Sequence, residues 1–183
     1  AGKQGEEIAI IASARMTNEE LFFVKHLAAQ LGTTNLDVVP RTGGADNYLR
    51  ADDLNPNTNG AKLILGIDPG AKLAEITELM SRGRLRVVLA FGENLLQAGF
   101  TQRDLEKVPF IASLQILANA SAELSDVVLP GTAYPEKRGS MINVTGRLQR
   151  LNRAVKAPGN AHDTWEILRD LIVACSGSNG IHT

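Results

Sequence analysis

Short apolar runs that alternate with helix-like segments are the feature that most constrains the fold of this 183-residue chain. The runs span residues 8–12, 36–39, 63–67, 86–91, 109–114 and 126–129. Runs of this length and composition are typical of strands that are buried on both faces of a parallel sheet. Strands that alternate with helices predict βαβ crossovers. We therefore expect an α/β fold with a mainly parallel, Rossmann-like sheet and helices on both of its faces.

The helix predictions rest on capping signals and on apolar spacing. Thr17 and Glu20 form a capping-box pattern, the apolar residues that follow repeat at helical spacing, and Gly32 stands at a typical helix end. Further helical patterns lie at residues 73–83, 101–107 and 120–124, and a final amphipathic helix runs from about Asp163 to Ala174. The chain thus begins strand, loop, helix and ends on a helix.

Two segments carry no regular period. Residues 41–61 are rich in Gly and Asn and predict a long loop, which in a compact domain is usually functional. Residues 131–161 are irregular, with a short hairpin expected around residues 140–143. We interpret residues 1–183 as one domain, a fragment of a larger one, with an α/β core at 1–130 and a loop segment plus C-terminal helix at 131–183.

Composition excludes several classes of function. The net charge is −1 and aromatic residues make up 4% of the chain, so nothing favours nucleic-acid binding. No apolar run approaches the roughly 18 residues of a membrane span. The single cysteine, Cys175, cannot form an internal disulfide or hold an iron–sulfur cluster alone, and we interpret it as a buried apolar residue in a reducing compartment.

No self-sufficient catalytic centre is visible in the sequence. The glycine-rich motifs of dinucleotide and ATP sites are absent, as is the nucleophile elbow of hydrolases. The three histidines, His26, His162 and His182, are far apart and have no metal-ligand spacing. We therefore expect no catalytic residue and no metal site.

A first candidate binding loop is formed by Gly92, Glu93 and Asn94, directly after a predicted strand. Ligands of open parallel sheets bind beyond the carboxyl ends of the strands. Gly lets a ligand approach the backbone, and Glu and Asn offer hydrogen-bonding groups. The same residues also suit an ordinary strand-to-helix turn.

A second candidate loop follows the last predicted strand, which ends at Pro130. It presents polar and glycine residues at Glu136, Gly139, Asn143, Gly146 and Arg147. Such a loop suits a polar, extended ligand or a neighbouring domain. It also suits a solvated loop whose glycines occupy turns.

These residues carry a family resemblance. The stretch from Asp126 to Pro130 (Asp-Val-Val-Leu-Pro), followed by Glu-x-x-Gly-Ser-x-x-Asn-x-x-Gly-Arg-x-Gln over residues 136–149, resembles the signature of the molybdopterin oxidoreductase family. Upstream, residues 17–20, 32–37, 46–49, 55–61 and 92–94 resemble one branch of it. That branch is the large iron–sulfur subunit, of the 75 kDa type, of respiratory NADH–quinone oxidoreductase, complex I.

The resemblance implies which residues would face a cofactor. In molybdopterin enzymes these two loops contact the nucleotide parts of the cofactor. The matching residues here are Gly92, Glu93, Asn94, Glu136, Gly139, Asn143, Gly146 and Arg147. Three positions depart from the family pattern, because Leu95 replaces a Pro, Thr145 replaces a Glu, and the usual Thr-Glu-Thr-Ala stretch reads Asn-Ala-Ser-Ala at residues 119–122. The resemblance therefore implies a vestigial site in a branch that does not hold the cofactor.

From the resemblance we expect a non-catalytic structural or assembly domain that supports electron transfer from NADH to quinone. Its iron–sulfur clusters would lie in a cysteine-rich N-terminal region outside this chain, and no cofactor is expected within it. Its partners would be other peripheral-arm subunits of complex I, on the cytoplasmic, inner face of the respiratory membrane. The alternatives are a molybdopterin-guanine-dinucleotide-binding fragment of another molybdopterin oxidoreductase and a plain interaction domain.

Overall fold

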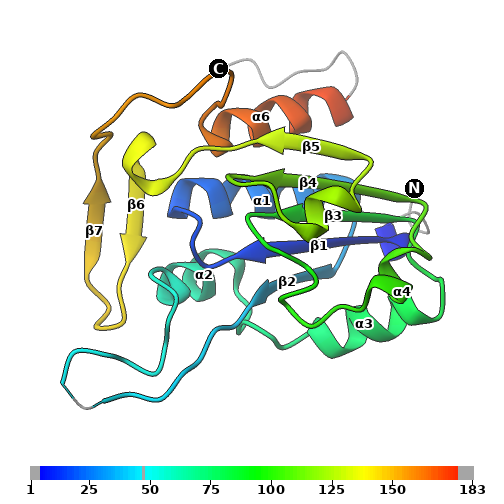
Figure 1. The fold of residues 1–183 in the computed structure, drawn as a ribbon, viewed down its shortest axis with the longest axis horizontal. Helices are drawn as coiled ribbons and strands as arrows, with labels where there is room; N and C mark the ends of the chain where they lie inside the picture. The colour runs from blue at the N-terminus through cyan, green and yellow to red at the C-terminus, as the bar shows by residue number, and fades with distance from the viewer. Residues whose placement is uncertain (1–4, 47, 177–183) are drawn as a thin grey trace.

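A computed structural model describes residues 5–46 and 48–176. Its elements, in chain order, are η1 (Gly5–Glu7), β1 (Ile8–Ser13), α1 (Asn18–Leu31), β2 (Asn35–Val39), α2 (Thr58–Leu65), α3 (Leu73–Ser81), β3 (Val87–Phe91), α4 (Gln102–Leu105), β4 (Phe110–Gln115), α5 (Ala120–Glu123), β5 (Val127–Pro130), η2 (Tyr134–Glu136), β6 (Gly139–Ile142), β7 (Leu148–Leu151) and α6 (Thr164–Cys175). Figure 1 shows a central sheet flanked by helices, with the β6–β7 hairpin set apart at one end.

The central sheet has five strands in the order β2-β1-β3-β4-β5, and every neighbouring pair is parallel. The chain passes from β1 outward to β2 and then crosses back to place β3 on the other side of β1. The expected mainly parallel α/β fold is therefore confirmed. The reversal of direction between β1 and β3 makes this the switch point of the sheet, where ligands of such folds bind.

Helices cover both faces of the sheet, as predicted. Successive strand residues point to opposite faces, so Ile10 packs in the cluster that contains α1 and α6, and Ile11 packs in the cluster that contains α3. Both side chains are fully buried. Full burial of one such side chain contributes about 1.5–3 kcal/mol, so the sheet is held between two apolar clusters, one on each face.

The first helix begins and ends as its sequence predicts. Thr17 Oγ1 accepts a hydrogen bond from the backbone N–H of Glu20 at 3.3 Å, and Glu20 Oε2 accepts one from the N–H of Thr17 at 2.7 Å. Gly32 ends the helix with a φ of 67°, in the left-handed region that favours glycine. The N-terminus of α1 is thereby fixed close to the carboxyl end of β1.

The predicted strand at residues 63–67 is wrong. Residues 63–65 are the last residues of α2 (Thr58–Leu65), and Gly66 caps the helix with a φ of 74°. A short apolar run fits a buried strand or the buried side of a helix equally well, and periodicity cannot separate the two. The exposure of Leu63 and the burial of Ala61 and Leu65 follow the helical face, so the irregular loop is shorter than predicted and ends before Thr58.

The C-terminal part contains the predicted hairpin and final helix. β6 and β7 pair antiparallel, with Ser140 opposite Arg150, so the hairpin extends further than expected. Helix α6 packs beside α1 through Leu168 and Ile172. The prediction of a buried Cys175 is wrong, because burial along α6 stops at Ile172 and its last turn is exposed.

None of the described helices combines the length and apolar character needed to cross a membrane.

Candidate functional site

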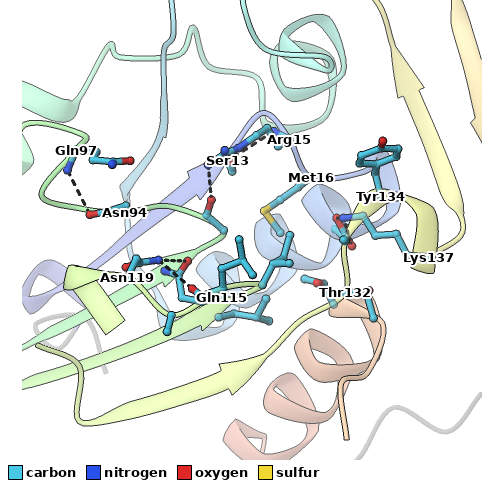
Figure 2. Close-up of a pocket in the computed structure, with 18 residues that line it drawn as sticks. Ser13, Arg15, Met16, Asn94, Gln97, Gln115, Asn119, Thr132, Tyr134 and Lys137 are labelled. Atoms are coloured by element: carbon cyan, nitrogen blue, oxygen red, sulfur yellow. Dashed lines mark hydrogen bonds and ion pairs between the residues drawn. The ribbon is translucent and has the colours of Figure 1, made fainter. Parts of the chain in front are cut away.

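A pocket of about 470 Å³ opens at the carboxyl ends of β1, β3 and β4. It is lined by Ser13, Arg15, Met16, Glu20, Gly92, Asn94, Gln97, Leu114, Gln115, Ile116, Leu117, Ala118, Asn119, Thr132, Ala133, Tyr134, Lys137 and Thr164. Figure 2 shows Asn94 and Gln97 on one side of it, and Tyr134 and Lys137 on the other. Its size is within the range of small-molecule sites, about 300–1,000 Å³.

The two central strands of the sheet supply the floor of the pocket. Ser13 ends β1 and Gly92 directly follows β3, so the pocket lies at the switch point. Gly92 has a φ of 73°, and a Cβ atom built on it would lie 3.4 Å from Ser13 Cβ. Glycine at position 92 lets the chain turn sharply at the place where the two strand ends meet.

The Glu93 carboxylate does not line the pocket but is buried behind it. Its side chain is fully buried, and Arg41 grips both oxygens, with Nη1 2.9 Å from Oε1 and Nη2 bonded to Oε2. The hydrogen bond to Glu93 raises the pKa of Arg41 above its ordinary value, and Coulombic attraction to Glu93 adds to this while burial opposes it. A charged pair bound at both oxygens is a strong structural link between the loop after β2 and the loop after β3.

Arg15, in the loop after β1, is a cation that lines the pocket. Its Nη2 donates to the backbone carbonyl of Gly92 at 3.0 Å and lies 3.7 Å from Glu93 Oε2. Its side chain remains 54% exposed. Arg15 thus offers a partly solvated positive charge, tied on one side to the loop that follows β3.

Three amide side chains of the pocket, those of Asn94, Gln115 and Asn119, are hydrogen-bonded to neighbouring side chains or to the backbone. Asn94 Oδ1 accepts from Ser121 Oγ at 2.8 Å, and Asn119 Nδ2 donates to Gln115 Oε1 at 3.1 Å. Gln115 Nε2 donates to the backbone carbonyl of Glu93 at 2.6 Å. These contacts fix the ends of β3 and β4 together and occupy donors of Gln115 and Asn119.

A second buried ion pair forms the other wall. Lys137 Nζ lies 2.9 and 2.8 Å from the two carboxylate oxygens of Glu20, and both side chains are almost fully buried. Glu20 also completes the capping box with Thr17. The pair holds the segment after β5 against the start of α1, and it neutralises the one lysine that lines the pocket.

The predicted site residues separate into two groups. Gly92 and Asn94 line the pocket, and Glu93 lies directly behind it. The five residues of the second predicted loop are not among the lining residues. They are Glu136, Gly139, Asn143, Gly146 and Arg147.

Two side chains of that second loop, those of Glu136 and Asn143, bond to the backbone of the loop itself. Glu136 Oε2 accepts from the backbone N–H of Ala133 at 2.8 Å. Asn143 Oδ1 accepts from the N–H groups of Thr145 and Arg147 at 3.1 and 2.9 Å, within the turn that joins β6 to β7. Gly146 adopts a φ of 82° in that turn. Glu136 therefore stabilises the turn at η2, and Asn143 stabilises the turn of the hairpin.

Four residues that sequence reasoning missed complete the site: Arg15, Arg41, Gln115 and Lys137. Arg15 and Arg41 come two residues after the ends of β1 and β2, at the same sheet edge as Gly92. The rule that selected Gly92 could have selected both, because the carboxyl ends of parallel strands meet at one edge. Gln115 is the last residue of β4, and nothing in the local pattern distinguishes it from an ordinary strand end.

No three histidine, cysteine, aspartate or glutamate side chains gather as metal ligands within residues 5–46 and 48–176. The fold and pocket define an open, parallel α/β domain with a pocket at its switch point, the place where folds of this class bind ligands. The sequence model of the molybdopterin oxidoreductase family matches residues 53–174. The chain belongs to this family.

The chain is also similar to several curated proteins. The NADH-ubiquinone oxidoreductase 75 kDa subunit of Reclinomonas americana is 50% identical over 50 residues, 27% of this chain and 7% of that protein. The mitochondrial NADH-ubiquinone oxidoreductase 78 kDa subunit of Candida albicans is 38% identical over 71 residues, 39% of this chain and 10% of that protein. The F420-dependent formate dehydrogenase 1 subunit alpha of Methanococcus maripaludis is 29% identical over 110 residues, which cover 57% of this chain and 16% of that protein. The matched part is thus a small share of each of these relatives.

Proposed function

We propose that the chain is a non-catalytic structural domain of the large peripheral subunit of a respiratory NADH–quinone oxidoreductase. In this role it supports electron transfer from NADH to quinone by holding neighbouring parts of the enzyme in place. The relatives named as NADH-ubiquinone oxidoreductase subunits support the choice of complex. The domain would belong to a longer subunit, with iron–sulfur clusters outside these residues, on the cytoplasmic, inner face of the respiratory membrane.

The observation that carries the proposal is the state of Glu93. In the family resemblance this residue belongs to a loop that faces the cofactor. Here its carboxylate is fully buried and held by the half-buried Arg41, so it cannot bond a ligand without giving up this ion pair. Breaking such a pair costs about 3–5 kcal/mol, which is more than a typical hydrogen bond to a ligand returns.

The donors of the pocket do not fit a pterin dinucleotide. Such a cofactor carries a pyrophosphate, which calls for several cations or free N–H groups. Of the described lining residues, Lys137 is neutralised by Glu20, and only Arg15 presents a partly solvated positive charge. Asn119 Nδ2 already donates to Gln115 Oε1, and Gln115 Nε2 already donates to the backbone carbonyl of Glu93. The pocket therefore fits a smaller, less charged group, or water.

A direct test is assembly of the complex in a host that carries the full-length subunit. Arg41→Ala weakens the domain, and we expect less assembled complex, measured by blue-native electrophoresis, with normal NADH oxidation per assembled complex. Arg103→Ala on exposed α4 is a matched control that should leave assembly unchanged. A loss of activity per assembled complex would contradict a purely structural role.

The alternative function, binding of a molybdopterin guanine dinucleotide, is favoured by the position of the pocket at the switch point. Thermal unfolding of the chain with GDP or GMP separates the two. A ligand stabilises the folded state by about 2.7 kcal/mol at a concentration 100 times its Kd, which would move the unfolding temperature by several degrees. We expect no shift at millimolar nucleotide, and no molybdenum by elemental analysis of the purified subunit.

A further inference from the structure

A second hollow lies away from the sheet edge, between the β6–β7 hairpin and the starts of helices α1 and α6. Its lining residues are Glu19, Phe23, Arg138, Gly139, Ser140, Leu148, Arg150 and Trp165. We call it the hairpin groove. Figure 1 shows the hairpin standing beyond the end of the sheet, with β7 as its outer strand. The groove has no part in the pocket described above, and none of its residues lines that pocket.

The apolar part of the groove is aromatic and partly solvated. The rings of Phe23 and Trp165 stack, with centroids 6.3 Å apart and an interplanar angle of 25°. Leu148 of β7 is 65% exposed. An aromatic pair beside an exposed leucine, rimmed by charged groups, has the composition of a surface that binds an apolar side chain of a partner.

Two arginines flank this apolar part. Arg138 and Arg150 are both exposed, and neither forms a salt bridge with any carboxylate in the described part of the chain. The carboxylate in the groove, Glu19, is turned toward Ser140, whose N–H and hydroxyl donate to its two oxygens at 2.8 Å. The guanidinium groups are therefore available to a carboxylate from outside, which they can bind through two parallel hydrogen bonds.

The hairpin also presents a strand edge. β7 pairs only with β6 within the described sheet, so its other edge is open. Leu148 and Arg150 alternate with Gln149 and therefore point to one face, the face that lines the groove. An extended segment laid along β7 would gain backbone hydrogen bonds and place alternate side chains on the hairpin face that carries Leu148 and Arg150.

We propose that the hairpin groove docks an extended acidic segment of another protein. One carboxylate of the segment pairs with Arg138 and Arg150, and an apolar side chain next to it packs on Trp165 and Leu148. The inference rests on the proposed structural role and names the chemistry of the partner that this role requires. A phosphate-bearing ligand fits less well, because its higher charge is repelled more strongly by Glu19 than a single carboxylate is.

The test is photocrosslinking within the assembled enzyme. A benzophenone amino acid replaces Leu148 in the full-length subunit, the complex is illuminated, and the joined peptides are sequenced by mass spectrometry. The same amino acid at Leu63, which is 73% exposed on α2, is the control for general exposure. We expect position 148, and not position 63, to capture one segment with Asp or Glu next to an apolar residue.

Charge reversal supplies the decisive comparison. Arg138→Glu with Arg150→Glu should lower the crosslink yield about tenfold, because like charges then face each other across the interface. Arg103→Glu, on exposed α4, should change it less than about twofold. Exchanging the acidic residue of the captured segment for Lys should restore the yield in the reversed variant. If the reversed subunit fails to fold, Arg138→Gln with Arg150→Gln replaces it, with a smaller expected loss.

Capture of a lipid, of a second copy of this chain or of a segment without a carboxylate would overturn the proposal, as would a yield unaffected by charge reversal or no adduct at all. These failures are distinct from failure of the structural role. If the complex assembles only with this domain intact but gives no adduct at position 148, the docking proposal alone is overturned. Nucleotide binding in the other pocket, with the acidic segment still captured at position 148, overturns the structural role and leaves the groove as a docking site.

Discussion

Arg41 and Glu93, 52 residues apart in the sequence, form a two-point ion pair behind the pocket at the switch point of the sheet. Arg41 comes from the loop after β2, and Glu93 from the loop after β3. Asn55, further along the loop that begins at Arg41, accepts a hydrogen bond from Arg41 at 3.3 Å. One guanidinium therefore fastens a long irregular loop to the centre of the domain.

Arg41→Ala should destabilise the chain strongly. The substitution leaves the fully buried Glu93 carboxylate with only Arg15, 3.7 Å away, as a neighbouring cation. Loss of one member of a buried pair costs about 3–5 kcal/mol, and the lower part of that range is expected because Arg15 compensates in part. Urea unfolding followed by circular dichroism measures the change in the free energy of unfolding.

A double variant isolates the cause. Arg41→Met with Glu93→Leu removes both charges and keeps apolar volume, and such replacements are often neutral or stabilising. It should recover most of the stability lost in Arg41→Ala. A double variant as unstable as the single one would show that shape, and not the stranded carboxylate, sets the cost.

Lys137→Met tests the second buried pair. The change leaves Glu20 buried, with the N–H of Thr17 as its remaining hydrogen-bond donor. We expect a loss of about 3 kcal/mol or more in the free energy of unfolding. Lys62→Met, which breaks the exposed pair with Asp68, should cost less than about 1 kcal/mol in the same assay. Equal effects of the two substitutions would refute the distinction between buried and exposed pairs.

Much of the fold could be predicted because local signals and burial agree. Strand β1 is an almost entirely apolar run that is buried on both faces, and the capping box at Thr17 fixes the start of α1. Strand β5 differs from the expected buried strand, because it lies at the edge of the sheet and Val127 and Val128 are exposed. The segment around Leu63 failed for a physical reason. Its apolar run is too short to show a helical or a strand period. The burial of its apolar face against α1, which the sequence does not reveal, goes with the helix.

The pocket could be predicted less well than the fold. Gly92 and Asn94 were accessible to sequence reasoning because they follow a strand directly. The pairing of Glu93 with Arg41 was not, because it depends on the path of a loop without regular structure. The segment from Glu136 to Arg147 carries a conspicuous polar pattern, yet Asn143 uses its carboxamide oxygen to hold its own turn. A pattern of residue types does not show whether a polar group faces a ligand or its own backbone.

Asn57→Ala should loosen the hairpin more than the sheet. Asn57 is fully buried, donates to the carbonyl of Met16 at 2.8 Å and accepts from the N–H of Ile142 at 2.7 Å. Removal of the carboxamide leaves both backbone groups without this partner, and each unsatisfied buried group costs about 1–3 kcal/mol. Amide hydrogen exchange should show faster exchange at Ile142, with little change at Leu89 in β3. Exchange that rises equally at both amides would indicate global destabilisation and contradict this local role.

Asp46 should keep the tip of the loop after β2 ordered in moderately acidic solution. Its Oδ1 accepts from the backbone N–H groups of Arg50, Tyr48 and Leu49 at 2.8, 2.9 and 2.8 Å, and these bonds, that of Arg50 first, lower the pKa of its carboxyl below the ordinary value. A group whose pKa is lower in the folded state stabilises that state at a pH above its unfolded value, about 3.9. This contribution is lost as the pH falls through the folded value.

Amide chemical shifts of Tyr48 and Leu49, followed by NMR during an acid titration, should therefore change with a midpoint below about 3.9. Asp46→Asn removes the titrating group and should abolish the transition, and a midpoint at or above the ordinary value would show that the three N–H groups do not hold the carboxylate in solution.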